Sequence, residues 1–385
     1  MTSPNTMADG LMKSVLIWIM VLVCPLAARA GDAGGLSGAE PEPSHCVPSF
    51  PYKDGWVGAD AAYSIPLGSG RSLWLFGDSF VAKTSRHVRE GAYFIRNSIA
   101  ISNCEAQSGW SINYHWRHQG SSQPRAFFDT EAEDHWYWPL DGFLHGDCVY
   151  LAVARVENDP AEKVFGFRIT GVDLVRISNI EASPDRWLMR HFKLTEGGGA
   201  VPGSSVVVKD EYVYLFTLYD DPPRKHQHMI VTRLPLANLE NPAASLEYLD
   251  KDRSWKAGLD REDALVILET GHSELSVRYR SDLKQWLAIS GAEFLSNRIV
   301  IRTAPDLTGP WSGWQTIYEM PEMSSETAGY DADTFCYAVK EHAELRQGPK
   351  CLITYVCNSF KFEKVIANLA IYRPRVIAVE IPPPK

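Results

Sequence analysis

Short apolar stretches of strand length recur along this chain in pairs, and a few turn residues join the members of each pair. The first pair covers residues 58–67 and 71–78, with a Gly-Ser-Gly sequence at 68–70 between them. Two apolar runs around such a turn predict a β-hairpin. Four further pairs show the same pattern: 141–144 with 148–153, 204–208 with 212–216, 274–279 with 285–289, and 334–339 with 351–356.

The five predicted hairpins follow one another at a regular pitch. Their second strands begin near residues 73, 149, 213, 285 and 352, a spacing of roughly 65 to 75 residues, which is enough for a four-stranded sheet with loops. Further strands fit between the hairpins, as at 97–101 and 298–302, and convincing helical periodicity is missing. The sequence therefore predicts an all-β, five-bladed β-propeller. A two-sheet sandwich also has many short strands, but the five-fold period favours the propeller.

The N-terminus predicts export. Lys13 precedes an apolar run from Val15 to Leu26, and Ala28-Arg29-Ala30 follows it. A basic start, a short apolar core and a small-residue cleavage site are typical of a secretory signal peptide, here residues 1–30, and the core is too short to span a membrane. Residues 31–48 are rich in Pro, Gly and Ser and predict a flexible lead-in. Residues 49–385 would then form the single propeller domain of a secreted or periplasmic monomer.

Composition and charge exclude some classes of ligand and predict the redox state of the cysteines. The net charge is −9 and no basic tract occurs, which argues against nucleic acid as a partner. Six cysteines remain after residue 30, an even number that favours disulfides in an exported chain. Cys336 and Cys351 lie on the two strands of the fifth hairpin, so we expect them to form one bridge. The chain has no C-x-x-C pair, and we expect neither a metal nor a cofactor.

Two aspartates lie at the open end of the first hairpin. With the turn centred on Ser69, residue 64 pairs with 74, and Asp60 lies opposite Asp78 on the same face of the sheet. Directly opposed like charges destabilise a sheet. A close carboxylate pair does serve acid–base chemistry, because one group can keep its proton while the other is ionised. The alternative is that Asp60 caps a strand and Asp78 begins a turn.

Acidic residues also open other hairpins. In a propeller the innermost strand of each blade lines a central channel, so we expect the residues that begin these strands to meet at one end of it. They are Asp60, Asp141, the Ser204-Ser205 pair, Glu274, and the Asp331/Asp333 pair. Converging carboxylates repel one another unless they share protons, bind a metal or meet a substrate. The candidate catalytic residues are therefore Asp60, Asp78, Asp141 and Glu274.

Aromatic residues beside these acids indicate a carbohydrate ligand. Trp136, Tyr137 and Trp138 shortly precede Asp141. Apolar sugar faces stack on aromatic rings, and carboxylates bind hydroxyl groups. We take Trp136 and Trp138 as substrate-binding candidates and expect one of them to pack between blades instead. Further substrate-binding candidates are Tyr63, Asp333 and His272.

Several of these motifs resemble one known family, the domain of unknown function 4185 family of five-bladed propellers, which includes bacterial endo-D-arabinanases (glycoside hydrolase family 183). The resemblance extends from about Gly55 to the C-terminus. It rests on Gly58-Ala59-Asp60 with Tyr63-Ser64, residues 74–78, Asn97-Ser98, residues 136–142, Pro310-Trp311, residues 337–342 and residues 372–375. It implies that acids in an axial pocket hydrolyse furanose polysaccharides, with Asp60 and Asp78 at the positions of two catalytic aspartates. Ala61-Ala62 departs mildly from the family's usual small-residue run and so affects the expected subsite shape.

The sequence thus predicts an exported glycoside hydrolase that acts on furanose-containing, arabinan-like polysaccharide. Asp60 would act as the base and Asp78 or Glu274 as the acid, while Asp141 orients the sugar or tunes the pKa of a neighbour. The alternative is a non-catalytic glycan-binding propeller associated with the cell envelope. A lyase or a phosphate-handling enzyme would need basic residues near these acids, and the sequence does not place them there.

Overall fold

The computed structural model describes residues 44–119, 123–130, 134–161, 166–221, 226–293 and 295–381, all within one compact unit, Leu36–Lys385. The predicted signal peptide and most of the predicted lead-in lie outside the described residues. The only α-helices in these ranges are short, α1 (Pro242–Ser245) and α2 (Phe362–Ala367). None of the helices described is long and apolar enough to cross a membrane.

Each predicted hairpin begins a separate sheet, and these five sheets are named blades 1 to 5. Blade 1 contains β2 (Tyr63–Gly68), β3 (Arg71–Phe76), β6 (Ser98–Glu105) and β7 (Gly109–His115). Blade 2 contains β10 (His135–His145), β11 (Cys148–Asn158), β12 (Phe167–Ser178) and β13 (Leu188–Glu196). Blade 3 contains β14 (Ala200–Lys209), β15 (Tyr212–Asp221), β16 (His226–Pro235), β17 (Glu247–Leu249) and β18 (Trp255–Ala257).

The remaining strands complete two blades and two small sheets. Blade 4 contains β19 (Leu275–Arg280), β20 (Gln285–Gly291), β21 (Arg298–Ala304) and β22 (Gln315–Glu319). Blade 5 contains β23 (Thr334–Glu341), β24 (Lys350–Ser359) and β25 (Arg375–Glu380). The small sheets consist of β1 (Trp56–Ala59), β4 (Ser79–Val81) and β5 (Tyr93–Ile95), and of β8 (Arg117–Gln119) and β9 (Gln123–Arg125).

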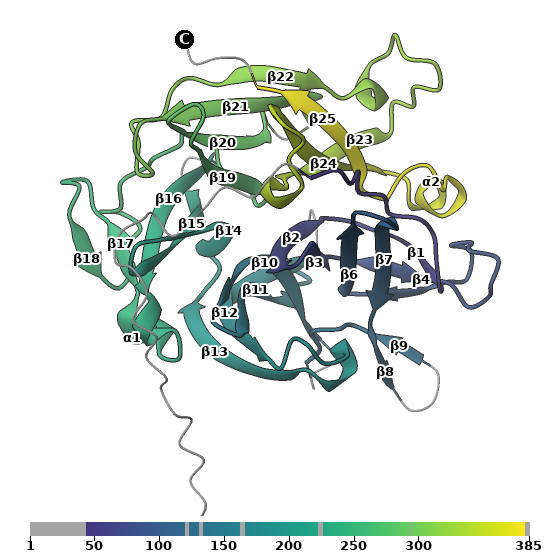
Figure 1. The fold of residues 1–385 in the computed structure, drawn as a ribbon, viewed down its shortest axis with the longest axis horizontal. Coiled ribbons are helices and arrows are strands. Elements are labelled where there is room, and N and C mark those ends of the chain that lie inside the picture. Colours follow the sequence, from purple (N-terminus) through teal and green to yellow (C-terminus); the bar gives the residue numbers. More distant parts are fainter. Residues whose placement is uncertain are drawn as a thin grey trace, which may run out of the picture. The chain divides into compact units, whose positions relative to one another are not determined.

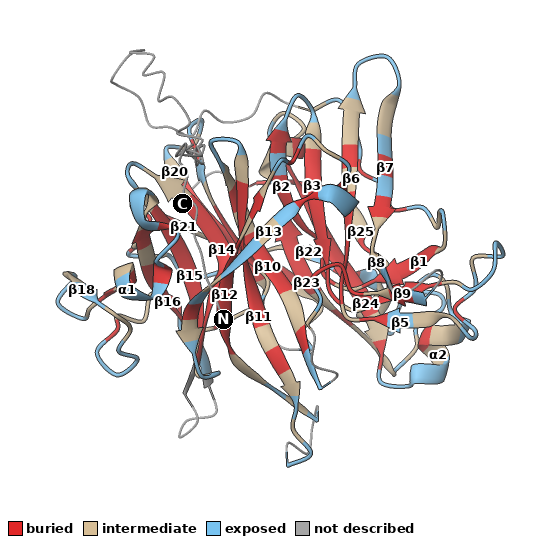
Figure 2. Ribbon diagram, turned by 90° about the horizontal axis from the view of Figure 1, so that it is seen from below, coloured by how far each residue is buried: buried red, intermediate tan, exposed pale blue. Residues whose placement is uncertain are grey.

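The first strand of each blade lies at the centre of the fold (Figure 1). These inner strands are β2, β10, β14, β19 and β23, and each contacts the next one along the chain. Inner strands flanked by two neighbouring blades are buried on both faces, and this requires continuous apolar runs rather than alternation. In β14 the first eight residues are buried. Figure 2 shows the buried residues concentrated in the strands and the exposed ones in the connecting loops. The fold is a β-propeller.

Side-chain hydrogen bonds of one kind join successive inner strands. In blades 2, 3 and 4 an inner-strand side chain accepts a hydrogen bond from a backbone N–H of the following inner strand. The pairs are Asp141 Oδ2 with Val206 N at 3.1 Å, Ser205 Oγ with Val277 N at 3.0 Å, and Ser276 Oγ with Glu341 N at 2.8 Å. Blade 5 is joined to blade 1 by Ser64 Oγ and His342 Nδ1, 2.7 Å apart. These bonds connect blades 2, 3, 4, 5 and 1 in succession.

The first hairpin has the predicted register. Ser64 lies opposite Trp74, and the same register holds from Tyr63 to Pro66. The turn at 68–70 requires glycine at its last position. Gly70 has a φ of 75°, and a Cβ atom there would lie 2.5 Å from the carbonyl oxygen of Cys104. A residue with a side chain would be both strained and blocked at this position.

The predicted Cys336–Cys351 bridge is wrong. Cys336 is bonded to Cys357, and a second disulfide joins Cys46 to Cys104. The strands of a hairpin run in opposite directions, so Cys336 near the beginning of β23 lies opposite Cys357 near the end of β24. Cys351 begins β24 close to the turn and is a free thiol.

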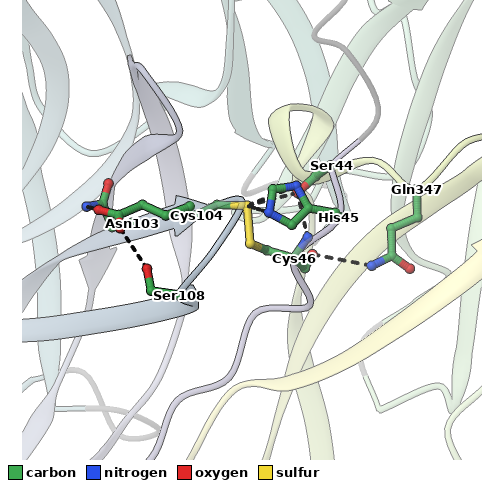
Figure 3. Close-up of a disulfide and its surroundings, with 8 residues drawn as sticks. Ser44, His45, Cys46, Asn103, Cys104, Ser108 and Gln347 are labelled. Atoms are coloured by element: carbon green, nitrogen blue, oxygen red, sulfur yellow. Dashed lines mark hydrogen bonds between the residues drawn. A yellow bond between two sulfur atoms is a disulfide. The ribbon is translucent and has the colours of Figure 1, made fainter.

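The other disulfide fastens the segment before β1 to blade 1. Figure 3 shows Cys46 bonded to Cys104 of β6, with the Gln347 side chain approaching Cys46 from the opposite side. Gln347 Nε2 donates a hydrogen bond of 3.3 Å to the carbonyl oxygen of Cys46. Gln347 follows β23 in the chain, so this segment is held by both the first and the last blade.

Candidate active site

Asp60 and Asp78 lie side by side at the open end of the first hairpin, as the sequence predicts. The backbone N–H of Asp60 donates to the carbonyl oxygen of Asp78 at 3.2 Å, and that of Gly77 donates to the carbonyl oxygen of Asp60 at 3.0 Å. A Cβ atom on Gly77 would lie 2.3 Å from Asp60 Oδ1. The missing side chain at position 77 therefore makes room for the Asp60 carboxyl group.

The surroundings of Asp60 favour its protonated form. Burial, followed by the charge of Asp78, raises the pKa of Asp60 well above its usual range. The Tyr337 hydroxyl donates a hydrogen bond of 2.9 Å to Asp60 Oδ2 and partly offsets this shift. Asn358 Nδ2 in turn donates to the Tyr337 oxygen at 3.3 Å. Two neighbouring buried carboxyl groups do not ionise independently, and Asp60 is the one that keeps its proton longer.

The surroundings of Asp78 are more favourable to an anion. Burial raises the pKa of Asp78 to about 6, and Arg96 and Trp138 oppose a larger rise. Trp138 Nε1–H donates to Asp78 Oδ1 at 3.1 Å, and Arg96 Nη1 lies 3.5 Å from Oδ2. Within the pair, Asp78 is therefore the residue that ionises first.

The two tryptophans of β10 have different roles. Residues two apart in a strand share a face, and the rings of Trp136 and Trp138 meet edge to face with centres 5.9 Å apart. Trp138 is half-buried and reaches Asp78. Trp136 is buried, and the Arg96 guanidinium lies 4.0 Å from its ring centre. Trp136 thus packs against Arg96.

Glu274 belongs to the same electrostatic group. Ser273 Oγ donates to Glu274 Oε2 at 2.7 Å, and the hydroxyl of the buried Tyr63 donates to the carbonyl oxygen of Ser273 at 3.0 Å. Tyr63 therefore holds the loop that presents Glu274. Burial raises the pKa of Glu274, and the charge of Glu274 contributes to the raised pKa of Asp60.

A small cavity of about 60 Å³ is lined by Glu274, His272 and Tyr337, among others. Burial, reinforced by the charge of Arg302, lowers the pKa of His272 to about 4. The imidazole is therefore neutral near pH 7 and can both donate and accept a hydrogen bond. A space of this size admits a few water molecules.

Asp141 lies deeper and is almost completely buried. Its carboxylate accepts hydrogen bonds from two backbone N–H groups and from Lys340 Nζ at 3.2 Å. Lys340 Nζ also donates to the carbonyl oxygens of Ser204 at 3.1 Å and Leu275 at 2.7 Å. Each charged group thus has several partners, as a buried ion pair requires. These partners give Asp141 a structural role, in the same series of inter-blade bonds as Ser205 and Ser276.

Asp333 belongs to a separate cluster of ion pairs. Its carboxylate lies 2.8 Å from Lys361 Nζ and 2.6 Å from Lys364 Nζ, and Lys364 also binds Asp331. The two lysines lower the pKa of Asp333. An acidic residue at the beginning of an inner strand is therefore not sufficient to place a carboxylate in the group around Asp60.

Three residues that shape the site were not singled out as candidates from the sequence: Arg96, Tyr337 and Lys340. The sequence did indicate that Lys340 is unusual, because Lys340-Glu341-His342 interrupts an apolar inner strand. All three residues are buried in the structure. Charged residues in a buried strand need partners from other elements. Arg96 lies in the loop between β5 and β6, where the sequence offers no comparable signal.

Backbone strain accompanies the Asp60–Tyr337 hydrogen bond. Ala61 and Ala338 directly follow these two residues and have φ values of 56° and 57°. The left-handed region is uncommon for residues other than glycine, and such strain gathers at functional sites. The backbone therefore turns abruptly at both positions, directly after the two residues whose side chains contact each other.

Solved structures similar to this chain share little sequence identity with it. One from Bacteroides ovatus, described as a hydrolase candidate, has a TM-score of 0.67 at 19% identity, covering 84% of this chain and 86% of that chain. An endo-arabinase from Bacteroides thetaiotaomicron has a TM-score of 0.46 at 9% identity, covering 84% and 95%. CoXyl43 is a GH43 beta-xylosidase/alpha-arabinofuranosidase from a compost microbial metagenome. It has a TM-score of 0.47 at 11% identity, and the match covers 89% of this chain and 95% of that chain. Likeness at such identities concerns the fold alone.

The family assignment comes from the sequence. No curated protein matches the chain. A family model matches it over residues 49–381. This match does not confirm the resemblance to the domain of unknown function 4185 family. The chain belongs to the family described as Domain of unknown function (DUF5005).

Proposed function

We propose that this protein is an exported glycoside hydrolase that cleaves furanose-containing, arabinan-like polysaccharide at the Asp60 end of its central channel. The observation that carries the proposal is the pair Asp60 and Asp78, whose surroundings push their pKa values apart. Glycoside hydrolysis needs two such carboxyl groups. One gives a proton to the leaving glycosidic oxygen, and the other assists attack on the anomeric carbon.

The surroundings of Asp60 and Asp78 favour acid and base roles opposite to those expected from the sequence. Asp60 keeps its proton longer, so we assign it as the general acid that protonates the leaving oxygen. Asp78 ionises first, with help from Arg96 and Trp138, so we assign it as the base or nucleophile. Glu274 assists Asp60, because its negative charge raises the pKa of Asp60 and keeps it protonated.

A neutral polysaccharide is the substrate class that these surroundings support. The half-buried Trp138 ring lies beside Asp78 and offers an apolar surface to a sugar. The net charge of −9 disfavours polyanionic substrates. The furanose preference rests on the resemblance to the endo-D-arabinanase family. Export is supported by the two disulfides, which persist in oxidising compartments.

Non-catalytic glycan binding is the second candidate function. It is favoured by the size of the cavity beside Glu274, which at about 60 Å³ admits water but not a sugar ring. A glycan would then be held at the mouth of the channel, outside this cavity.

Incubation with α-L-arabinan, D-arabinan and galactan, followed by chromatography of the products, separates the two functions. We expect sugar release from an arabinan by the natural protein and by Asp252→Asn, a control at an exposed aspartate. Asp60→Asn and Asp78→Asn should reduce the rate by ~10²–10⁴-fold, because Asn cannot transfer a proton. Binding of a glycan without sugar release would support the second function. Full activity in both Asn variants would overturn the assignment of the pair.

A further inference from the structure

A second cavity, of about 860 Å³, lies in the same central channel. Every inner strand contributes at least one residue to its wall: Ser64 from β2, Gly142 from β10, Val206 from β14, Val277 from β19 and Glu341 from β23. A cavity bounded by all five inner strands is part of the axial channel of the propeller. Its volume lies in the range of roughly 300–1,000 Å³ that is typical of small-molecule sites.

This cavity and the aspartate pair occupy opposite ends of the channel. Along β23, Tyr337 bonds to Asp60, Lys340 follows three residues later, and Glu341 then lines the cavity. The buried Lys340–Asp141 pair lies between the two ends. A molecule in the 860 Å³ cavity is thus separated from Asp60 by this ion pair.

The wall combines aromatic rings with a carboxylate that lacks a close donor. The rings of Tyr279 and Trp286 line one side with their centres 5.4 Å apart, and Tyr279 is 37% exposed. The Glu341 side chain is only 4% exposed, and Arg278 Nε lies 3.9 Å from its Oε2. Within the described part of the chain, no hydrogen bond reaches the Glu341 carboxylate oxygens. A mostly buried carboxylate that lines the cavity without a close donor can accept a hydrogen bond from a ligand.

The charges of the wall favour a neutral ligand. It contains four basic and four acidic side chains: Lys209, Arg278, Arg280 and Arg346, and Asp210, Asp306, Glu341 and Glu344. Arg280 is already bound to Asp282 through two hydrogen bonds of 2.9 and 2.7 Å, and Arg278 donates to the carbonyl oxygen of Val277 at 2.8 Å. An anion would therefore find no excess of positive charge. A wholly apolar molecule would leave the charged groups of the wall desolvated without partners.

We propose that this cavity is a second ligand site, distinct from the aspartate pair, and that it binds a short neutral oligosaccharide. A sugar ring stacks on Tyr279 while one of its hydroxyl groups donates to Glu341, a combination of apolar face and charge-assisted hydrogen bond that suits carbohydrates. The inference does not rest on the proposed function, because the site binds its ligand whether or not Asp60 and Asp78 perform catalysis.

Titration calorimetry with arabinotriose, xylotriose and galactotriose tests the site, using the full chain without its signal peptide. We expect at least one trisaccharide to bind, and its affinity to fall at least tenfold in Tyr279→Ala and several-fold in Glu341→Gln. Asp252→Asn, at an exposed aspartate outside both sites, is the control and should bind the trisaccharide unchanged. Circular dichroism melting of each variant verifies that it is folded.

Three results would overturn the proposal. Binding that is lost in Asp78→Asn but kept in both Tyr279→Ala and Glu341→Gln would place the sugar at the aspartate pair. No binding by any of the three trisaccharides would remove the carbohydrate assignment. Binding of decyl phosphate that requires Tyr279, with none of the sugars bound, would assign the cavity to an anionic amphiphile. If the natural protein hydrolyses no glycan, this binding test is unaffected. The proposed hydrolase function and the proposed second site can therefore fail separately.

Discussion

Lys340 Nζ and Asp141 Oδ2 lie 3.2 Å apart in the interior of the propeller, and both side chains are 1% exposed. Asp141 belongs to blade 2 and Lys340 to blade 5. Lys340 also donates to carbonyl oxygens of blade 3 and blade 4. One ammonium group therefore connects four blades. Such a buried pair persists because its polar atoms are satisfied by hydrogen bonds.

Lys340→Met is expected to lower the free energy of unfolding by about 3–5 kcal/mol, because it leaves a buried carboxylate and two carbonyl oxygens without their donor. Urea denaturation followed by tryptophan fluorescence measures the change. Lys251→Met, at a lysine that is 62% exposed, is the control and should change stability little. A loss below about 1 kcal/mol in Lys340→Met would contradict the connecting role of Lys340.

The hairpins and their order were predictable because their determinants are local. Turn residues and apolar runs mark each inner strand and its partner, so the register of Ser64 with Trp74 and the opposition of Asp60 and Asp78 follow from a short segment. The direction of strands within a hairpin is equally local. Applied to the fifth hairpin, it would have paired Cys336 with Cys357.

The partners of the site residues were not predictable, because they come from distant parts of the chain. Lys340 reaches Asp141 across 199 positions, and Tyr337 reaches Asp60 across 277. A residue that begins an inner strand can be assigned to one end of the channel from the sequence. The ion pairs that this residue forms cannot be predicted in the same way. Asp333 therefore looked equivalent to Asp60 in sequence, although two later lysines engage it.

Asp78→Asn should stabilise the protein at pH 8 but not at pH 4. Burial raises the pKa of Asp78 to about 6 from a usual value of 3.8, so folding disfavours its ionised form. The contribution of this group to stability is therefore fully present below pH 3.8 and is lost as the pH rises through about 6. A shift of this size corresponds to about 3 kcal/mol at most.

Thermal denaturation between pH 4 and pH 8 checks this. The Tm of Asp78→Asn minus that of the natural protein should be near zero at pH 4 and positive at pH 8. Asp252→Asn is the control, and its difference should not follow this course. A Tm difference that is the same at both pH values would mean that Asp78 is not destabilised by burial.

Tyr337→Phe should move the pH dependence of catalysis. The Tyr337 hydrogen bond lowers the pKa of Asp60, so its loss raises that pKa further. With Asp60 as the general acid, activity falls where Asp60 loses its proton. The basic limb of kcat/KM against pH should therefore shift to higher pH, and Tyr330→Phe, at an exposed tyrosine, should leave it in place. An unchanged basic limb in Tyr337→Phe would assign the acid to another group, with Glu274 the first to examine.

Thiol labelling distinguishes the two disulfide patterns. Of the six cysteines after residue 30, four are in the bridges Cys46–Cys104 and Cys336–Cys357, and the free thiols are Cys148 and Cys351. Cys148 is half-buried, whereas Cys351 is fully buried, and burial raises the pKa of the Cys351 thiol to about 12. The thiolate is the reactive form, so alkylation of the native protein should label Cys148 alone.

Unfolding and reduction complete the test, because each should add a defined number of labels. Denaturant without reductant should expose Cys351 and give two labels, and reduction should give all six. Peptide mapping by mass spectrometry identifies the labelled residues at each stage. A bridge between Cys336 and Cys351 would instead place Cys357 among the residues labelled before reduction. Six labels without reductant would show that neither disulfide forms, and this would remove the support that the cysteines give to export.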